Sequence, residues 1–287
     1  MKWTGRRQST NIEDRRGMSR GGMLAGGGLT GIIIIIAALL FGVDPTQLLQ
    51  QVDSGSVIET GTQQAASPEE EQLKQFIAVV LADTEDIWNQ LFPAEFNQDY
   101  VEPQLTLFTG FVSSACGRAS TASGPFYCPM DAKVYIDLAF FAELEQRFGA
   151  AGDFAQAYVV AHEVGHHIQN QLMVFEQVRA QAAGGTKEQS NQLSVRTELQ
   201  ADFLAGVWAH HAQRLKNILE PGDIDEALNA ATMIGDDRLQ KMTQGYIVPD
   251  SFTHGTSAQR ARWFRLGYES GNLDRMQEAF TRESADL

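Results

Sequence analysis

The sequence predicts a mostly helical α+β protein behind one N-terminal transmembrane helix. A run of 23 residues without charge, Gly21 to Val43, lies near the N-terminus. After residue 68, apolar residues recur at helical spacing over most of the chain, and two short segments are rich in β-forming residues. The chain has 287 residues, 43% of them hydrophobic and 20% charged, which is ordinary for a globular protein.

The first twenty residues are basic. They hold six basic and two acidic side chains, a net charge of +4, whereas the whole chain carries −14. A body this acidic is not expected to bind nucleic acid. About 20 apolar residues cross a bilayer as a helix, and a basic flank stays in the cytoplasm. We therefore expect residues 1–20 to form a cytoplasmic head, residues 21–43 a single-pass anchor in the cell membrane, and the rest to lie in the periplasm or outside the cell.

A cleavable signal peptide has the same layout of charge followed by an apolar stretch. The pair Arg15-Arg16 is also compatible with twin-arginine export. Residues 41–45 offer no small-x-small cleavage site, which favours an anchor that is retained.

Residues 44–67 are rich in polar residues and predict a flexible linker, followed by one folded domain over residues 68–287. Pro93 is expected to end the first helix of this domain, and Asp153 to cap the third. We expect helices over residues 68–92, 138–148, 153–183, 190–219, 223–246 and 257–280, and strands over residues 104–113 and 133–137.

The chain has two cysteines, Cys116 and Cys128. In an oxidising space outside the membrane they could close a small loop, and the alternative is two unpaired small hydrophobic residues. The predicted topology favours the disulfide.

The main chemical motif is His162-Glu163-Val164-Gly165-His166. Two histidines four residues apart lie on one face of a helix, one turn from each other, so both imidazoles can reach one zinc ion. Glu163 is placed to take the proton of a water molecule beside that ion. The alternative is a buried helix whose histidines have ordinary hydrogen-bond partners.

A catalytic zinc ion needs a third protein ligand. A histidine at position 172 after a glycine at 169 would be one source, but the chain has Leu172 and Gln169 there. Glu198 and Asp202 share a face of the next long helix, where most neighbouring residues are apolar. We expect Glu198 to be the third ligand and Asp202 to accept the free N–H of a ligand histidine.

The segment His254 to Arg260 precedes and enters a later helix. His254 or Arg260 could donate a hydrogen bond to the carbonyl oxygen as it becomes anionic during amide hydrolysis. The alternative is a loop histidine and a surface arginine. His167 is rotated about 100° from His166, and His210 and His211 lie three turns beyond Glu198, so we expect none of these three to join the ion.

Together these motifs resemble the bacterial family described as "putative neutral zinc metallopeptidase". The segments that carry the resemblance are Lys2 to Arg7, Asn11 to Gly17, Gly124 to Pro129, His162 to His167, Glu198 to Asp202, and His254 to Arg260. The resemblance covers nearly the whole chain and implies a zincin-like fold and peptidase activity. The last segment is also similar to the His-Pro…Arg element of membrane-bound gluzincin peptidases, with Gly255 in place of the proline.

These observations predict a membrane-anchored peptidase with one zinc ion held by His162, His166 and Glu198. Its partners would be peptides or proteins, and the strand over residues 133–137 is expected to pair with the substrate backbone. The alternative function is a non-catalytic zinc-binding interaction or assembly protein tethered to the membrane. Glu163 argues against it, because a structural zinc site has no use for a base there.

Overall fold

The computed structural model describes residues 1–17, 67–120, 123–146 and 149–287. The predicted transmembrane helix and nearly all of the predicted linker lie outside these residues. Within the described ranges, no helix combines the length and the apolar character needed to cross a bilayer. The chain divides into two compact units, one formed by Met1–Arg15 and Ser67–Leu287, the other by Arg16–Ala66, and the fold below is that of the first.

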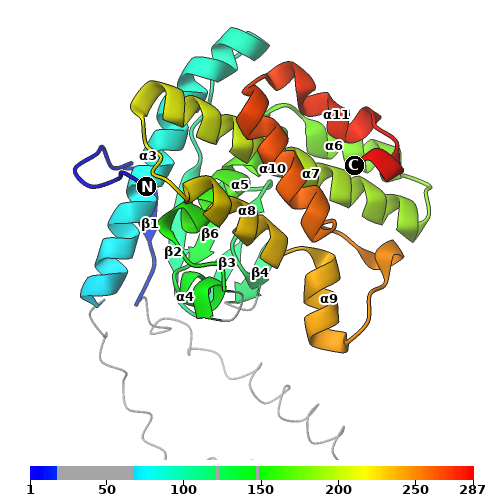
Figure 1. Ribbon diagram of the computed structural model, residues 1–287, viewed down its shortest axis with the longest axis horizontal. Helices are drawn as coiled ribbons and strands as arrows, with labels where there is room; N and C mark the ends of the chain where they lie inside the picture. Colours follow the sequence, from blue (N-terminus) through cyan, green and yellow to red (C-terminus); the bar gives the residue numbers. More distant parts are fainter. Residues whose placement is uncertain (18–66, 121–122, 147–148) are drawn as a thin grey trace, which may run out of the picture. The chain divides into compact units, whose positions relative to one another are not determined.

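This unit is a mostly helical α+β domain, with helices packed around a small sheet (Figure 1). Its strands are β1 (Ile12–Asp14), β2 (Gln104–Phe108), β3 (Phe111–Ser114), β4 (Gly117–Ser120), β5 (Phe126–Cys128) and β6 (Lys133–Asp137). Its helices are α3 (Pro68–Phe96), α4 (Ala139–Gln146), α5 (Asp153–Gln171), α6 (Val174–Ala182), α7 (Lys187–Lys216), α8 (Asp223–Met233), α9 (Asp236–Gln244), α10 (Ser257–Ser270) and α11 (Glu278–Thr281), with 3-10 turns η2 (Pro249–Ser251), η3 (Leu273–Gln277) and η4 (Ser284–Asp286).

Helix starts are set by side-chain caps. Ser67, Thr186 and Thr256 each accept the amide of the third residue of the helix, and the Glu or Gln at that position bonds back to the cap. Helix α3 runs one turn beyond its predicted end, because Pro93 lies in the last turn and Asn97 closes the helix in a left-handed conformation.

Three predicted long helices are each divided. The helix over residues 153–183 is α5 followed by α6, and Met173 takes a left-handed conformation (φ 60°) between them. The helix over residues 223–246 is α8 followed by α9, which begins after Gly235. The helix over residues 257–280 ends as α10 at Gly271, also left-handed, before η3 and α11. Hydrophobic periodicity continues into α6 and α11 because Phe175 and Phe280 pack on the same core as the helices before them, whereas no residue of α9 packs on that core.

The main sheet has the strand order β1-β2-β6-β5, parallel except for β5, which runs antiparallel to β6 at one edge. The predicted strand over residues 133–137 is confirmed as β6. The strand predicted over residues 104–113 is two strands, β2 and β3, separated by a turn at Gly110 (φ 75°). Because β2 and β5 occupy both edges of β6, the predicted pairing of that strand with a substrate is wrong.

The basic N-terminal segment packs on the domain rather than forming a separate head. Residues 12–14 pair with residues 105–107 as β1. The Arg6 guanidinium lies 2.6 Å from a carboxylate oxygen of Asp83 on α3, and that of Arg7 lies 2.9 Å from Glu85 on the same helix. These two arginines therefore neutralise buried carboxylates of α3. The predicted boundary between a cytoplasmic head and the folded domain is wrong for Met1–Arg15, which belong to the domain.

Helices α5, α7 and α10 lie close together (Figure 1), and their buried faces supply much of the hydrophobic core. Helices α7 and α10 touch backbone to backbone at two glycines. A Cβ added at Gly206 would lie 2.1 Å from the Phe264 carbonyl oxygen, and one added at Gly267 would lie 2.0 Å from the Phe203 carbonyl oxygen. Only glycine permits this approach, which brings the later turns of α10 against α7.

The predicted disulfide is present between Cys116 and Cys128. Cys116 lies in the turn of the β3–β4 hairpin, and Cys128 is the last residue of β5 and is buried. The bond therefore ties the hairpin to the edge strand of the main sheet.

Candidate metal centre and active site

The two histidines of α5 meet Glu198 of α7. The Nε2 atom of His162 lies 3.2 Å from one carboxylate oxygen of Glu198, and the Nε2 atom of His166 lies 3.4 Å from the other. All three ligand atoms lie within 4.8 Å of one another. The predicted ligand set is thus assembled, although its two halves come from different helices.

Gly165 explains how α5 and α7 come close enough. A Cβ on Gly165 would lie 2.9 Å from the carbonyl oxygen of Ala201 and 3.2 Å from its Cα. Glycine in mid-helix costs about 1 kcal/mol relative to alanine. Here it allows the α7 backbone to lie against the α5 backbone, one turn from Glu198.

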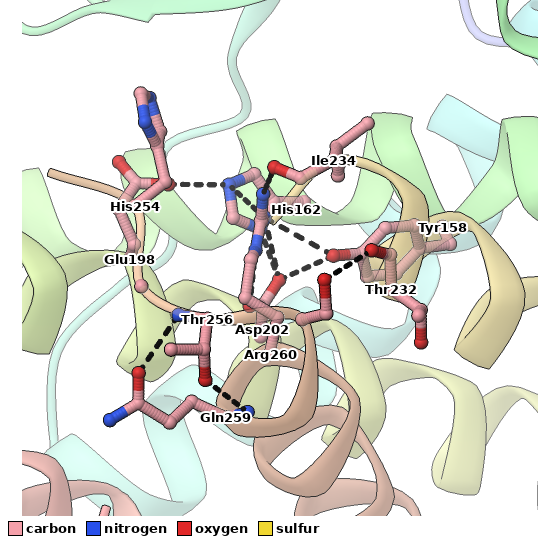
Figure 2. Close-up of polar contacts among 12 residues, drawn as sticks. Tyr158, His162, Glu198, Asp202, Thr232, Ile234, His254, Thr256, Gln259 and Arg260 are labelled. Atoms are coloured by element: carbon pink, nitrogen blue, oxygen red, sulfur yellow. Dashed lines mark hydrogen bonds and ion pairs between the residues drawn. The ribbon is translucent and has the colours of Figure 1, made fainter. Parts of the chain in front are cut away.

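The other ring nitrogen of His162 is held by Asp202, as predicted. His162 Nδ1 donates to Asp202 Oδ1 at 2.8 Å, and the Tyr158 hydroxyl donates to the same oxygen at 2.5 Å (Figure 2). Asp202 is fully buried, so its charge requires compensation.

Arg260 supplies that compensation. Its Nε and Nη2 atoms lie 2.9 and 3.0 Å from the two Asp202 oxygens (Figure 2). Arg260 is only 3% exposed and is committed to this bidentate pair. Arg260 also lines the wall of the site, and its predicted role as a donor to substrate stays a prediction.

His166 has a neutral partner that the sequence did not reveal. Its Nδ1 lies 2.8 Å from the side-chain oxygen of Gln169, which is fully buried on the same helix. Each histidine thus has one nitrogen fixed by a hydrogen bond and the other directed at Glu198.

The charges of the cluster favour a bound cation. Burial opposes ionisation of Glu198, but His166 and His162 hold the pKa of its carboxyl well below its usual range. Burial also opposes the charged form of His162, yet the charge of Asp202 and the hydrogen bonds to Asp202 and Glu198 raise its pKa to about 10. The site therefore attracts positive charge, either a proton or a metal ion.

Glu163 lies beside these ligands in the wall of a cavity of about 790 Å³. It is 7% exposed, and burial raises the pKa of its carboxyl, which nearby His162 and His166 partly oppose. The cavity is lined on other sides by residues of β5 and by apolar residues of α4 and α9, including Phe126, Tyr127, Phe140 and Leu239.

His254 lines the same cavity. Asp236, the first residue of α9, accepts the backbone amides of Thr253, His254 and Gly255 and lies 3.1 Å from His254 Nδ1. Asp236 also raises the pKa of His254, mainly through the hydrogen bond to its ring. The structure thus places the predicted His254 in the site and adds Asp236, which a single sequence does not single out.

The remaining histidines lie outside the cluster, as predicted. His167 Nδ1 bonds to the Tyr127 hydroxyl at 3.0 Å, which fixes α5 to β5. His210 and His211 bond to carbonyl oxygens of Tyr268 and Gly271 at the end of α10.

Two imidazole nitrogens and one carboxylate oxygen are a ligand set typical of catalytic zinc. The residues fit such an ion, because both histidines direct Nε2 toward Glu198 and because the cluster opens into a cavity with room for a substrate. Carboxylate-only sites, which suit calcium or magnesium, have no equivalent of these imidazoles.

Comparison with known proteins agrees with this site. The sequence model of the family described as "Putative neutral zinc metallopeptidase" matches residues 1–279. The "Uncharacterized protein YpfJ" of Escherichia coli strain K12 is 46% identical over 281 residues, which cover 95% of this chain and 96% of that protein. The "Uncharacterized protein Rv2575" of Mycobacterium tuberculosis is 41% identical over 253 residues, which cover 82% of each chain. No solved structure shows a significant match.

Proposed function

Because this chain belongs to the "putative neutral zinc metallopeptidase" family, we propose that it is a zinc-dependent peptidase with a zincin-like catalytic domain. The observation that carries the proposal is the convergence of His162, His166 and Glu198 beside Glu163 in one cavity. A purely structural zinc site would have no use for a buried base next to its ligands.

In this function, His162, His166 and Glu198 would hold the ion. Zinc bound there would supply Lewis acidity, which would polarise a peptide carbonyl and make a water molecule easier to deprotonate. Glu163 takes the proton from that water and returns it to the leaving amine. The raised pKa of Glu163 suits both steps, since a carboxylate with a higher proton affinity is a stronger base.

His254 acts on the substrate carbonyl oxygen. Its Nδ1 is occupied by Asp236, which leaves the other ring nitrogen for a hydrogen bond to the oxygen as negative charge develops. The hydrogen bond to Asp236 raises the pKa of His254, which favours the form of the ring that carries a proton on both nitrogens. This is the role predicted from sequence for either His254 or Arg260, now given to His254 alone.

Strand β5 is suited to bind the substrate backbone. It is an edge strand of the sheet, and Phe126 and Tyr127 line the cavity. An extended peptide can add to such an edge through main-chain hydrogen bonds. Together with Phe140 and Leu239, these side chains favour peptides with large apolar residues near the cleaved bond.

We also propose that residues 21–43 attach the protein to the cell membrane and that Met1–Arg15 and Ser67–Leu287 lie together on its periplasmic or extracellular face. The disulfide supports an oxidising compartment. The pairing of β1 with β2 supports a shared side, because paired strands cannot be separated by a bilayer. This proposal takes the place of the predicted topology, in which the chain crosses the membrane once and residues 1–20 form a cytoplasmic head.

Thiol labelling tests this placement. Gln8 and Lys241 are exposed, one in each part, and the two native cysteines are paired. In intact spheroplasts, a membrane-impermeant maleimide should label Gln8→Cys and Lys241→Cys equally. If Gln8→Cys is labelled only after lysis, while Lys241→Cys is labelled in intact spheroplasts, the predicted topology with a single membrane crossing would be correct.

Glu163→Gln tests the enzymatic function. The change keeps the side-chain shape but removes the base, so peptide hydrolysis should fall by about 10²–10⁴-fold while zinc stays bound. Glu143→Gln is the matched control, since Glu143 lines the cavity but is exposed on α4 and has no role in the mechanism. Equal cleavage of a mixed peptide library by zinc-loaded wild type and Glu163→Gln would refute the mechanism. Zinc binding with no hydrolysis by the wild type would favour the non-catalytic alternative.

A further inference from the structure

Beyond the ligands themselves, a chain of buried amides lies behind His166. Gln169 and Gln200 are 0% and 1% exposed, so every polar atom they carry needs a partner inside the protein. Gln169 Nε2 lies 2.7 Å from the carbonyl oxygen of Thr197 and 3.0 Å from Gln200 Oε1. Gln200 Nε2 lies 3.1 Å from the carbonyl oxygen of Met276 in η3.

Two backbone carbonyls decide which way these amides face. A carbonyl oxygen only accepts, so the atoms next to Thr197 O and Met276 O must be the donating NH₂ groups. Gln169 Oε1 must then be the atom that faces His166 Nδ1, at 2.8 Å. An oxygen there accepts, so Nδ1 of His166 carries a proton, and in the neutral ring Nε2 then carries the lone pair.

Gln169 competes with Glu198 for that proton. Glu198 Oε1 lies 3.4 Å from His166 Nε2, which is longer than an ordinary N–H···O bond, whereas the Gln169 contact is of normal length. Without Gln169, the proton could move to Nε2 and bond to Glu198, which would block the nitrogen needed for metal binding.

We propose that Gln169 is a positioning residue that fixes the His166 tautomer, and that Gln200 and the Met276 carbonyl keep Gln169 in its orientation. His162 is held by the charged Asp202–Arg260 pair, whereas His166 is held by a neutral amide chain that ends near the C-terminus. The consequence for zinc binding rests on the proposed function, but the tautomer itself does not.

The test compares three variants of the full chain. Gln169→Met keeps the side-chain length and removes both hydrogen-bonding groups. Gln169→Glu keeps an oxygen facing His166, and its second oxygen, when protonated, still donates to the Thr197 carbonyl. Gln200→Met removes one of the two acceptors of the Gln169 amide and leaves the Thr197 carbonyl. Gln90→Met changes an exposed glutamine of α3 and is the matched control.

Zinc affinity, measured by competition with a chromophoric chelator, should fall by about 10–100-fold in Gln169→Met. It should fall by less than about 10-fold in Gln200→Met, and should stay near the wild-type value in Gln169→Glu and Gln90→Met. The ¹⁵N spectrum of the metal-free protein should show the His166 proton on Nδ1 in wild type and Gln169→Glu, and on Nε2 in Gln169→Met.

A folded Gln169→Met protein with wild-type zinc affinity and an unchanged His166 tautomer would overturn the proposal. If Gln169→Met does not fold, loss of the Nδ1 proton in Gln169→Glu would overturn it equally. A wild type that binds no zinc would refute the proposed function, and the tautomer measurement would still decide the role of Gln169.

Discussion

Removal of Arg260 should destabilise the protein as well as inactivate it. The pair with Asp202 is buried on both sides, with contacts of 2.9 and 3.0 Å. Removing one partner of such a pair leaves an uncompensated charge and costs about 3–5 kcal/mol. For a domain of this size, about 1 kcal/mol shifts Tm by about 2–4 °C, so a loss of about 6–20 °C is expected.

The loss of stability should differ between removal of Arg260 and removal of Asp202. In Arg260→Leu, Asp202 keeps hydrogen bonds from Tyr158 and His162, so the cost should lie near the lower end of the range. In Asp202→Leu, the guanidinium keeps weaker contacts, to the Tyr158 hydroxyl at 3.2 Å, the His162 ring at 3.4 Å and the Ile234 carbonyl at 3.5 Å, so the cost should lie near the upper end. The double variant should lose less than the sum of the single variants, because it leaves no unpaired charge.

Thermal unfolding of the metal-free full chain measures these effects. Arg265→Leu is the control, since Arg265 is exposed on the same helix as Arg260. The reasoning fails if Arg260→Leu melts within about 2 °C of wild type yet hydrolyses no peptide. That result would return Arg260 to its predicted role as a donor to substrate.

Three further predictions concern the same site. In Gly165→Ala, the higher helix propensity of alanine stabilises the protein by about 1 kcal/mol, but overpacking against Ala201 costs about 1–3 kcal/mol. Zinc affinity should therefore fall, and the free energy of unfolding should not rise. Tighter zinc binding in a chelator competition would contradict the argument from close contact. The His254–Asp236 pair raises the pKa of His254, so its contribution to stability is complete below about pH 6.5 and is lost as pH rises through the raised value. In urea unfolding, the difference in the free energy of unfolding between wild type and Asp236→Asn should therefore be larger at pH 6 than at pH 9. An equal difference at both pH values would contradict a stabilising His254–Asp236 pair. Removal of zinc by a chelator should abolish hydrolysis and leave the far-ultraviolet circular dichroism unchanged, because the core of α5, α7 and α10 is apolar; loss of helix signal would make the metal structural.

The ligands could be predicted because their spacing is a local property of helices. Residues four apart share a face wherever the helix lies, so His162 with His166, and Glu198 with Asp202, formed recognisable pairs. The role of Arg260 depended on which element packs against Asp202, and nothing near residue 260 encodes that contact. The role of Gln169 was not predicted, since a glutamine in a helix is most often a surface residue. This residue was noted in the sequence only because it stands where an arrangement with a third histidine ligand would have glycine.

The N-terminal segment shows a different limit of sequence reasoning. Basic residues before an apolar run have the same composition whether they face a membrane or pair with acids far along the chain. The partners of Arg6 and Arg7 lie on α3, 77 and 78 residues later, and β1 has only three residues. Neither feature produces a periodic pattern, and both became visible only in the fold.

The pairing of Asp202 with Arg260 also bears on biosynthesis. The ribosome makes the metal ligands before residue 200, but the arginine that neutralises the carboxylate behind His162 follows 58 residues after Asp202. Until α10 has been made and has packed against α7 through Gly206 and Gly267, that carboxylate lacks its guanidinium partner. A growing or truncated chain therefore has all its zinc ligands without a finished site, and hydrolytic competence is acquired only when nearly the whole protein has been translated.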